Sequence, residues 1–267
     1  MFKIISLILI FGCCILQAQE YNYPFQDPEN HIGMRVNDLV DRLTLEEKAA
    51  MMLYNSPAIE RLGIPEYNWW NDCLHGVGRS GKATVFPQAI GMAATFDDAL
   101  IRRVAVAISD EARAKHHEFI RGGQRGIYQG LTMWSPNINI FRDPRWGRGH
   151  ETYGEDPFLT GQLGKEFVMG LQGDDPNYLK LVATAKHYAV HSGPEKLRHE
   201  FDANVSDVDL HETYLPAFKT LITEAGAYSV MGAYNLFRGK PCCANPFLYG
   251  ILRDDWGFDG YIVSDCW

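Results

Sequence analysis

Apolar residues recur three and four positions apart in several stretches of the chain, which is the spacing of one face of an α-helix. After residue 90 this spacing predicts four helices: residues 97–115, a helix from about Asp156, residues 207–226, and a short helix with Asn245 as its cap and Pro246 at its first position. In the first of them, Ile101, Val104 and Ile108 share one side. Each of these helices therefore has an apolar face that we expect to pack against a core.

Short β-prone runs separate these helices, at residues 180–188, 227–235 and 259–265. Strands that alternate with helices predict an α/β fold, with a parallel sheet covered by helices. The three runs end in polar groups: Lys186-His187-Tyr188, Tyr234-Asn235 and Ser264-Asp265. Successive strands that each present polar groups at their carboxyl ends are typical of a (β/α)8 TIM-type barrel, which we favour. A doubly wound sheet with its ligand at a switch point is the alternative.

The N-terminal part of the chain has two distinct segments. Residues 1–18 carry Lys3, an apolar stretch and a small residue before a plausible cleavage point, which predicts a signal peptide and an exported, periplasmic or secreted protein. A membrane anchor, or a lipid attached at Cys13 or Cys14, is an open alternative. After this segment, an amphipathic helix is predicted from about Asn37, with a second start at Thr44 in a Thr-x-x-Glu capping box.

The amino-acid composition argues against several kinds of ligand and partner. The 267-residue chain has a net charge of -8 and no run of basic residues, which argues against nucleic acid. Four cysteines follow the predicted signal peptide, too few for a disulfide framework in so large a domain, and no Cys-x-x-Cys spacing suggests a metal site. We therefore expect buried free thiols.

Two motifs match ligand-binding patterns, but the residues around them argue against those ligands. Residues 76–84 fit the spacing of dinucleotide and P-loop motifs, but no buried strand precedes the glycines, Pro87 follows, and Ala83 stands where a P-loop needs Ser or Thr. His187 and His191 are four residues apart, yet His187 closes a strand pattern instead of lying in a helix. We expect no nucleotide, no metal and no other cofactor, and an active-site loop at residues 76–84.

Aromatic and charged residues gather in the same stretches of the chain. Trp69, Trp70, Trp134 and Trp146 are each consistent with an ordinary core position, but together with Asp, Arg, Lys and His at strand ends they predict a sugar site. Aromatic faces cover the C–H surfaces of a pyranose, and charged groups bind its hydroxyls.

These stretches resemble glycoside hydrolase family 3, the exo-acting β-glucosidases and β-xylosidases. The resemblance rests on "FRDPRWGRGHETYGEDP" at residues 141–157, followed in order by Lys-His-Tyr, Met-x-x-Tyr-Asn and Ser-Asp, and it runs from about Tyr23 to Trp267. It implies hydrolysis of terminal non-reducing β-linked sugars in oligosaccharides or in aryl and alkyl β-glycosides, by a retaining double displacement. A non-catalytic sugar-binding module on the same fold is the alternative.

The resemblance also assigns roles to individual residues. It implies that Asp265 is the catalytic nucleophile, and we expect neighbouring cations to hold the pKa of its carboxyl down. Substrate-binding roles are implied for six residues: Asp72, Arg148, Lys186, His187, Tyr234 and Arg198. Tyr234 is expected beside the nucleophile. For Arg198, a structural ion pair with Glu200 or Asp202 is an equally good interpretation, and Glu151 is expected to hold the Arg-rich loop.

The sequence leaves the sugar and the proton donor open. Asp72 suits a glucoside in an otherwise xylosidase-like frame, whereas Cys266 favours the xylosidase branch, so glucose, xylose and arabinose all remain open. In the family the general acid/base is a Glu in a second, downstream domain. We therefore expect residues 19–267 to form a barrel domain that is incomplete at its C-terminal end, lacks that domain as its partner, and has little activity alone.

Overall fold

The computed structural model describes residues 21–191 and 193–266. The chain divides into two compact units, residues 1–50 and 51–267. The segment predicted to be a signal peptide lies outside the described residues. Within the described part of the chain, no helix has the length and apolar character needed to cross a membrane.

In the first unit, two helices follow a short 3-10 turn at Pro24–Gln26: α1, Ile32–Arg42, and α2, Leu45–Met51. Helix α1 begins five residues before the predicted start, because the His31 imidazole accepts a hydrogen bond from the Gly33 N–H and caps the helix there. The second start is confirmed. The Glu47 N–H donates to the Thr44 hydroxyl, and the Thr44 N–H donates to the Glu47 carboxylate, which completes the predicted capping box.

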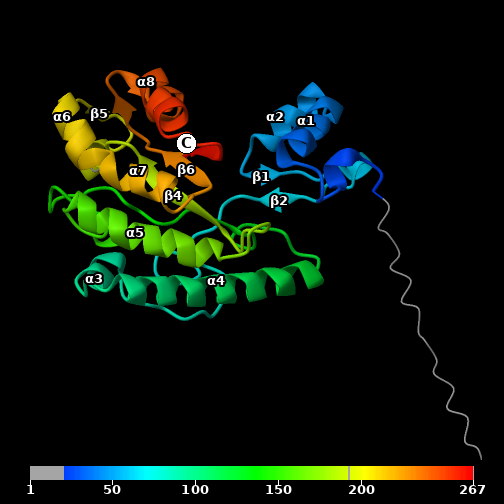
Figure 1. Cartoon of the computed structure of the whole chain (residues 1–267), viewed down its shortest axis with the longest axis horizontal. Coiled ribbons are helices and arrows are strands. Elements are labelled where there is room, and N and C mark those ends of the chain that lie inside the picture. Colours follow the sequence, from blue (N-terminus) through cyan, green and yellow to red (C-terminus); the bar gives the residue numbers. More distant parts are fainter. Residues whose placement is uncertain (1–20, 192, 267) are drawn as a thin grey trace, which may run out of the picture. The chain divides into compact units, whose positions relative to one another are not determined.

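In the second unit, a parallel four-stranded sheet has the order β3-β4-β6-β9 (Figure 1). Its strands are β3, Thr132–Met133; β4, Val182–Tyr188; β6, Ser229–Gly232; and β9, Tyr261–Ser264. Short β-structure lies outside this sheet: β1, Asn55–Ser56, with β2, Tyr67–Asn68; and a three-stranded sheet of β5, Asp202–Ala203, β7, Leu236–Phe237, and β8, Lys240–Pro241.

Helices precede the first strand of the parallel sheet and lie between its later strands in the chain. They are α3, Ala89–Ala93; α4, Asp98–Arg121; α5, Pro157–Gln172; α6, Asp207–Asp209; α7, Pro216–Thr223; and α8, Pro246–Gly250, with π-helical turns after α6 and α8 at Leu210–Tyr214 and Ile251–Asp255. The predicted starts of three helices are confirmed: Asp97 caps α4, Asp156 caps α5, and Asn245 caps α8 as predicted. Helices α4, α5 and α7 lie side by side along the sheet (Figure 1).

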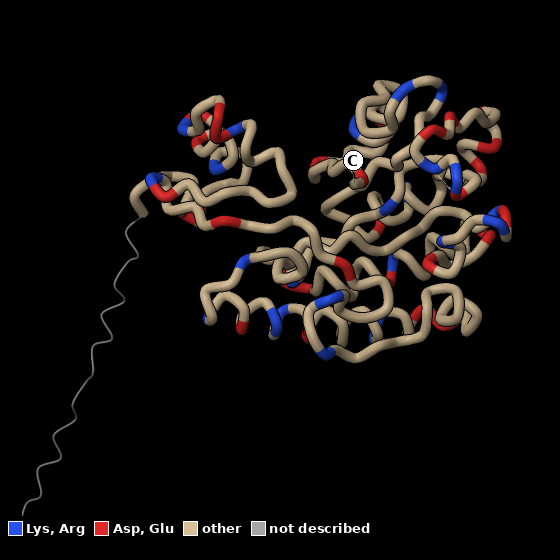
Figure 2. Tube along the Cα trace, turned by 180° about the vertical axis from the view of Figure 1, so that it is seen from behind, with Lys and Arg blue, Asp and Glu red and all other residues tan. Residues whose placement is uncertain are grey.

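Close packing joins these helices to one another. A β-carbon at Gly170 of α5 would lie 2.6 Å from the β-carbon of Ala105 in α4, so glycine is what lets the two helices approach. Ile101, Ile108 and Phe167 are fully buried between them. Acidic and basic residues are interspersed along the chain (Figure 2), in keeping with helices whose outer faces are solvated.

The arrangement is a half-barrel of parallel strands. The strands of the sheet follow one another in the same order as along the chain, and within residues 51–191 and 193–266 this order does not reverse, so there is no switch point of the doubly wound kind. Strand β3 was not predicted, because two residues are too short to give a pattern. It pairs with β4 at Thr132–Val182 and Met133–Ala183 and extends the sheet on the side opposite β9.

Candidate active site

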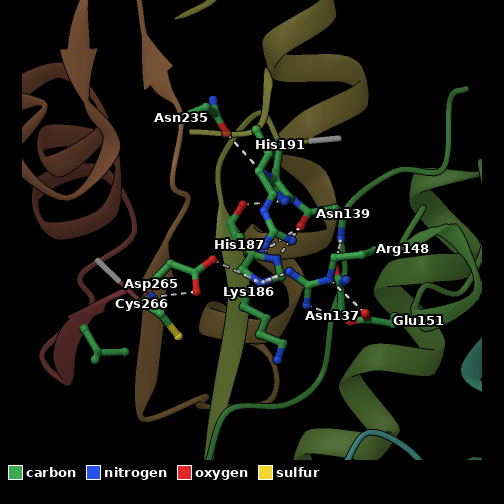
Figure 3. A network of polar contacts seen from close by, with 12 residues as sticks. Asn137, Asn139, Arg148, Glu151, Lys186, His187, His191, Asn235, Asp265 and Cys266 are labelled. Atoms are coloured by element: carbon green, nitrogen blue, oxygen red, sulfur yellow. Dashed lines mark hydrogen bonds and ion pairs between the residues drawn. The ribbon is translucent and has the colours of Figure 1, made fainter. Parts of the chain in front are cut away.

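The seven predicted site residues gather at the carboxyl ends of the parallel strands. Lys186 and His187 belong to the end of β4, Tyr234 follows β6, and Asp265 follows β9. Asp72 follows Asn71, which bridges to β3. With Arg148 and Arg198 from two loops, all seven line one cavity of about 370 Å³, which we call the polar cavity. Figure 3 shows Arg148, Lys186, His187 and Asp265 together, with Asp265 pointing toward His187.

Asp265 is buried, with 8% of its surface exposed. One carboxylate oxygen, Oδ1, accepts a hydrogen bond of 2.8 Å from the Cys266 N–H. The other, Oδ2, is buried without a hydrogen-bond partner among the described residues and lies 3.5 Å from Nε2 of His187. Burial raises the pKa of this carboxyl, and it outweighs the Cys266 N–H, the charges of Lys186 and Arg148, and the Tyr234 hydroxyl, which all lower it. The expectation that cations hold this pKa down was therefore wrong.

Lys186 and Asp72 form a pair across the polar cavity. Nζ of Lys186 is 3.8 Å from Oδ2 of Asp72. The Ser135 hydroxyl and the Cys73 N–H donate to the other oxygen of Asp72, at 2.7 and 2.9 Å, so its orientation is fixed. Lys186 is buried, and a buried ammonium needs such a partner. This pair presents one cation and one anion to the cavity, a combination that can bind both lone pairs and protons of hydroxyl groups.

Arg148 is held by Glu151 in a two-pronged ion pair. Nε and Nη2 of Arg148 donate to the two oxygens of Glu151 at 2.8 and 2.7 Å. Burial raises the pKa of Glu151, but the hydrogen bonds and charge of Arg148 outweigh it, so the pKa lies below its usual value. The predicted structural role of Glu151 agrees with this contact. Planar pairing of this kind fixes the guanidinium in one orientation.

Arg198 and Tyr234 lie together on another wall of the polar cavity. The guanidinium carbon of Arg198 is 5.5 Å from the centre of the Tyr234 ring, and Nη1 donates to Glu195 at 2.8 Å. The predicted ion-pair partners, Glu200 and Asp202, were wrong, because the 3-10 turn at Glu195–Leu197 brings the side chain three residues before Arg198 onto the same side. Burial and the nearby Asp265 carboxylate raise the pKa of the Tyr234 hydroxyl, which therefore stays protonated.

A second cavity, of about 640 Å³, adjoins the polar one, and we call it the aromatic cavity. It is lined by residues 51–54, by Trp69, Trp70 and Trp134, and by residues 261–266. The rings of Trp70 and Trp134 are 5.0 Å apart. Trp146 lies elsewhere, buried against Phe141 and His191, and of the four tryptophans it is the one that lines neither of these two cavities.

The glycine loop has a structural context unlike a nucleotide site. Gly76 has a φ of +137° and its position is so crowded that a β-carbon would lie 2.3 Å from the Thr84 carbonyl oxygen. No helix begins between this loop and α3 at Ala89, so no helix N-terminus faces it. Instead Gly76 and Gly78 line the polar cavity, as the active-site-loop interpretation predicted. In the described ranges, no three His, Cys, Asp or Glu side chains are placed to hold a metal ion, and all four cysteines of this part of the chain are free thiols.

Sequence reasoning placed Asn235 at a strand end but missed Asn139, which supports His187. Asn139 contacts His187, and Asn235 contacts His191 (Figure 3). Asn139 stands two residues before the quoted "FRDPRWGRGHETYGEDP" motif, yet a lone asparagine between apolar residues carries no signal of its own. Its role depends on the backbone of β4, which is distant in sequence.

The site thus consists of a buried carboxylate and paired charges at the strand ends of a parallel α/β half-barrel. Residues 29–267 match the "Glycosyl hydrolase family 3 N terminal domain". The chain belongs to this family.

Similar proteins carry related names. A xylan 1,4-β-xylosidase of Xylanibacter ruminicola is 50% identical over 98% of this chain and 31% of its own length. A β-xylosidase/α-L-arabinofuranosidase 2 of Medicago sativa subsp. varia is 42% identical over 96% of this chain and 34% of its own. The chain thus spans about a third of the length of these relatives.

Solved structures agree with the fold. A GH3 exo-β-xylosidase in complex with a xylobiose aziridine activity-based probe is 38% identical, with a TM-score of 0.83 over 91% of this chain and 32% of that one. A GH3 β-glucosidase of Bifidobacterium adolescentis is 32% identical, with a TM-score of 0.72 over 85% of this chain and 32% of that one.

Proposed function

We propose that this chain forms the sugar-binding and nucleophile-bearing part of an exo-acting glycosidase that hydrolyses terminal non-reducing β-linked sugars, as a β-xylosidase or a β-glucosidase. The observation that carries the proposal is the polar cavity. It gathers a buried carboxylate, Asp265, with the paired charges of Lys186 and Asp72 and the fixed guanidinium of Arg148. The names of the similar proteins support the same class of reaction.

In this proposal Asp265 is the catalytic nucleophile of a retaining mechanism. The carboxylate attacks the anomeric carbon, the bond from that carbon to the leaving oxygen breaks, and a covalent glycosyl-enzyme forms. A water molecule then attacks the same carbon, and the carboxylate leaves. Oδ2 suits the attack, because it has no hydrogen-bond partner among the described residues, whereas Oδ1 is held by the Cys266 N–H.

The charged side chains bind and orient the sugar. Asp72 accepts hydrogen bonds from hydroxyl groups, and Lys186, Arg148 and Arg198 donate to them. Burial raises the pKa of Asp265, and the positive charges of Lys186 and Arg148 oppose that rise and so favour the anion. The Tyr234 hydroxyl lies near the carboxylate and also lowers its pKa.

A second carboxyl group must protonate the leaving oxygen, and we propose that it comes from outside residues 21–266. A general acid needs a pKa raised toward neutrality. Glu151 has the opposite shift and is bound to Arg148, and Asp72 is paired with Lys186. The similar proteins are about three times as long as the region that they share with this chain, so a downstream domain of the kind found in the family is a suitable partner.

The same proposal includes closure of the half-barrel into a TIM-type barrel and export through the segment at residues 1–18. Both follow from the sequence pattern. The sugar is not fixed by Asp72, because the room left by one methylene discriminates by only about 1–3 kcal/mol. Xylosides are the first substrates to test, since xylosidases stand among the similar proteins of highest identity.

The test is turnover of aryl β-xyloside, β-glucoside and α-L-arabinofuranoside by the full-length protein, with the anomer of the released sugar followed by NMR. A retaining enzyme releases the β-anomer of xylose or glucose first. Release of the α-anomer of xylose or glucose first would contradict the double displacement. Tight sugar binding without turnover of any glycoside would support the sugar-binding module instead.

A further inference from the structure

Asn139 lies behind His187, away from the polar cavity, and four hydrogen bonds fix its amide. Oδ1 accepts from the His187 backbone N–H at 2.8 Å and faces Nδ1 of the same residue at 2.9 Å. Nδ2 donates to the His187 and Ala189 carbonyls at 2.9 and 3.3 Å. A flipped amide would set an NH2 group against the N–H and an oxygen against two carbonyls. The amide therefore has one orientation, with Oδ1 toward the imidazole.

This orientation fixes the tautomer of His187. An amide oxygen only accepts, so Nδ1 of His187 must carry a proton. On the other side of the ring, Nη1 of Arg148 lies 3.3 Å from Nε2, and a guanidinium only donates. Nε2 must therefore be an unprotonated acceptor. Two independent neighbours, one on each ring nitrogen, require the same neutral imidazole (Figure 3).

We propose that Asn139 is a positioning residue, which holds His187 in the neutral Nδ1-protonated form so that Nε2 anchors Arg148 and gives no hydrogen bond to Asp265. This inference deepens the proposed function and rests on it for its catalytic consequence. With Glu151 on one side and His187 on the other, the Arg148 guanidinium is held at three of its N–H groups. Oδ2 of Asp265, 3.5 Å from Nε2, stays free of a donor from the ring.

The charges around His187 agree with a neutral ring. Burial, and then the positive charge of Arg148, His191 and Lys186, lower its pKa well below the usual value. Asp265 after β9 is the anion that faces the ring, and Glu151 reaches it only through Arg148. Among the groups on β4, on the Arg148 loop and after β9, the His187 ring thus faces one anion directly and several cations.

A direct test is the tautomer itself. In the full-length protein with ¹⁵N-labelled histidine, the His187 signals are assigned by their loss in a His187→Gln variant. We expect a protonated, pyrrole-type Nδ1 and an unprotonated, pyridine-type Nε2 at neutral pH. A protonated Nε2 would overturn the inference, whether or not the protein hydrolyses glycosides, so this readout stands apart from the proposed function.

The kinetic test is Asn139→Asp. A carboxylate beside Nδ1 favours the imidazolium, whose Nε2–H repels Arg148 and donates to Asp265. We expect kcat to fall roughly 10- to 100-fold, the scale for disturbing a hydrogen bond to a charged group. The deficit should be largest at low pH and shrink as pH rises through the His187 pKa. A deficit independent of pH would contradict positioning, because a merely structural defect has no reason to follow this titration.

The chain offers a matched control in Asn235→Asp. Asn235 faces Nδ1 of His191 at 3.0 Å and donates to the Val190 and Leu236 carbonyls, so its contacts copy those of Asn139. His191, however, does not line the polar cavity. We expect a smaller loss of kcat for this control than for Asn139→Asp, without a deficit that grows at low pH. An equal, pH-dependent loss in both variants would overturn a specific role for Asn139.

Discussion

The polar cavity and the aromatic cavity share Trp70, Trp134, Asp265 and Cys266, but their other walls are chemically opposite. The polar cavity is lined by ion pairs whose members are held by further hydrogen bonds. The aromatic cavity is lined by indole and phenol rings and by aliphatic side chains of β9. The carboxylate of Asp265 stands where the two meet, which places it between groups that bind hydroxyls and groups that cover C–H surface.

This difference teaches how each wall contributes. Charged groups in a buried wall act through fixed geometry, so a small change in shape has a large effect. Aromatic faces act through contact area and tolerate small shifts. We therefore expect substitutions to have the largest effects at the shared carboxylate, intermediate effects in the polar wall and small effects in the aromatic wall.

The largest effect is expected for Asp265→Asn. The amide keeps the shape of the side chain but cannot act as the nucleophile, so kcat should fall by about 1,000-fold or more, as when other enzymes lose their nucleophile. Steady-state hydrolysis of an aryl β-xyloside measures it. The control is Asp259→Asn, because Asp259 is exposed and lies just before β9. This variant should keep wild-type kcat. Near-normal turnover by Asp265→Asn would show that the carboxylate shared by the two cavities is not the nucleophile.

An intermediate effect is expected for Arg148→Lys. Lysine keeps the charge but loses the two-pronged pair with Glu151 and the contact with His187, so kcat/KM should fall roughly 10- to 100-fold. Arg145→Lys is the matched control, because Arg145 is exposed in the same loop and pairs with Asp143. If both variants lose activity equally, the fixed geometry of the polar wall is not what matters.

A smaller effect is expected for Trp70→Ala. Loss of one aromatic face should raise KM about 2- to 10-fold with little change in kcat, which corresponds to the ~0.5–1.5 kcal/mol of an aromatic contact. Trp70→Phe retains a ring and should recover most of the loss. A drop in kcat as large as that of Arg148→Lys would show that the two walls do not differ in the way described.

The smallest effect is one of stability, and it has the opposite sign to the loss of activity. Because burial raises the folded-state pKa of Asp265 above 3.8, the ionised carboxylate destabilises the fold. Its protonated form contributes stability that is fully present below pH 3.8 and lost as pH rises through the folded-state pKa. Asp265→Asn should therefore raise the Tm of the full-length protein at pH 7 and leave it unchanged at about pH 3. A lower Tm at pH 7 would mean that the cations outweigh burial.

Much of the fold was predictable because it depends on local signals. The helix caps at Asp97, Asp156 and Asn245 lie within three residues of the N–H groups that they bind, and the three predicted strands are short β-prone runs between helical patterns. β3 was not predictable, since its two residues are defined by their partner in β4.

The candidate site shows the same difference between what local sequence signals predict and what distant contacts determine. Seven residues could be placed at one cavity from strand ends and motifs, but their partners could not. Glu195 instead of Glu200 pairs with Arg198 because of a turn whose geometry no pattern encodes. Asn139 supports His187 across 48 positions of sequence. The pKa of the Asp265 carboxyl is raised because the residue is buried. The sequence shows which charged residues are near a position more readily than it shows burial.

The covalent intermediate tests the central claim most directly. The full-length protein is incubated with a 2-deoxy-2-fluoro β-xyloside or β-glucoside that carries a good leaving group, and the labelled peptide is sequenced by mass spectrometry. The account predicts one sugar attached to Asp265, and no adduct in Asp265→Asn. A sugar on Asp72, Glu151 or any other carboxylate, or turnover of the β-glycoside with no adduct at all, would contradict it.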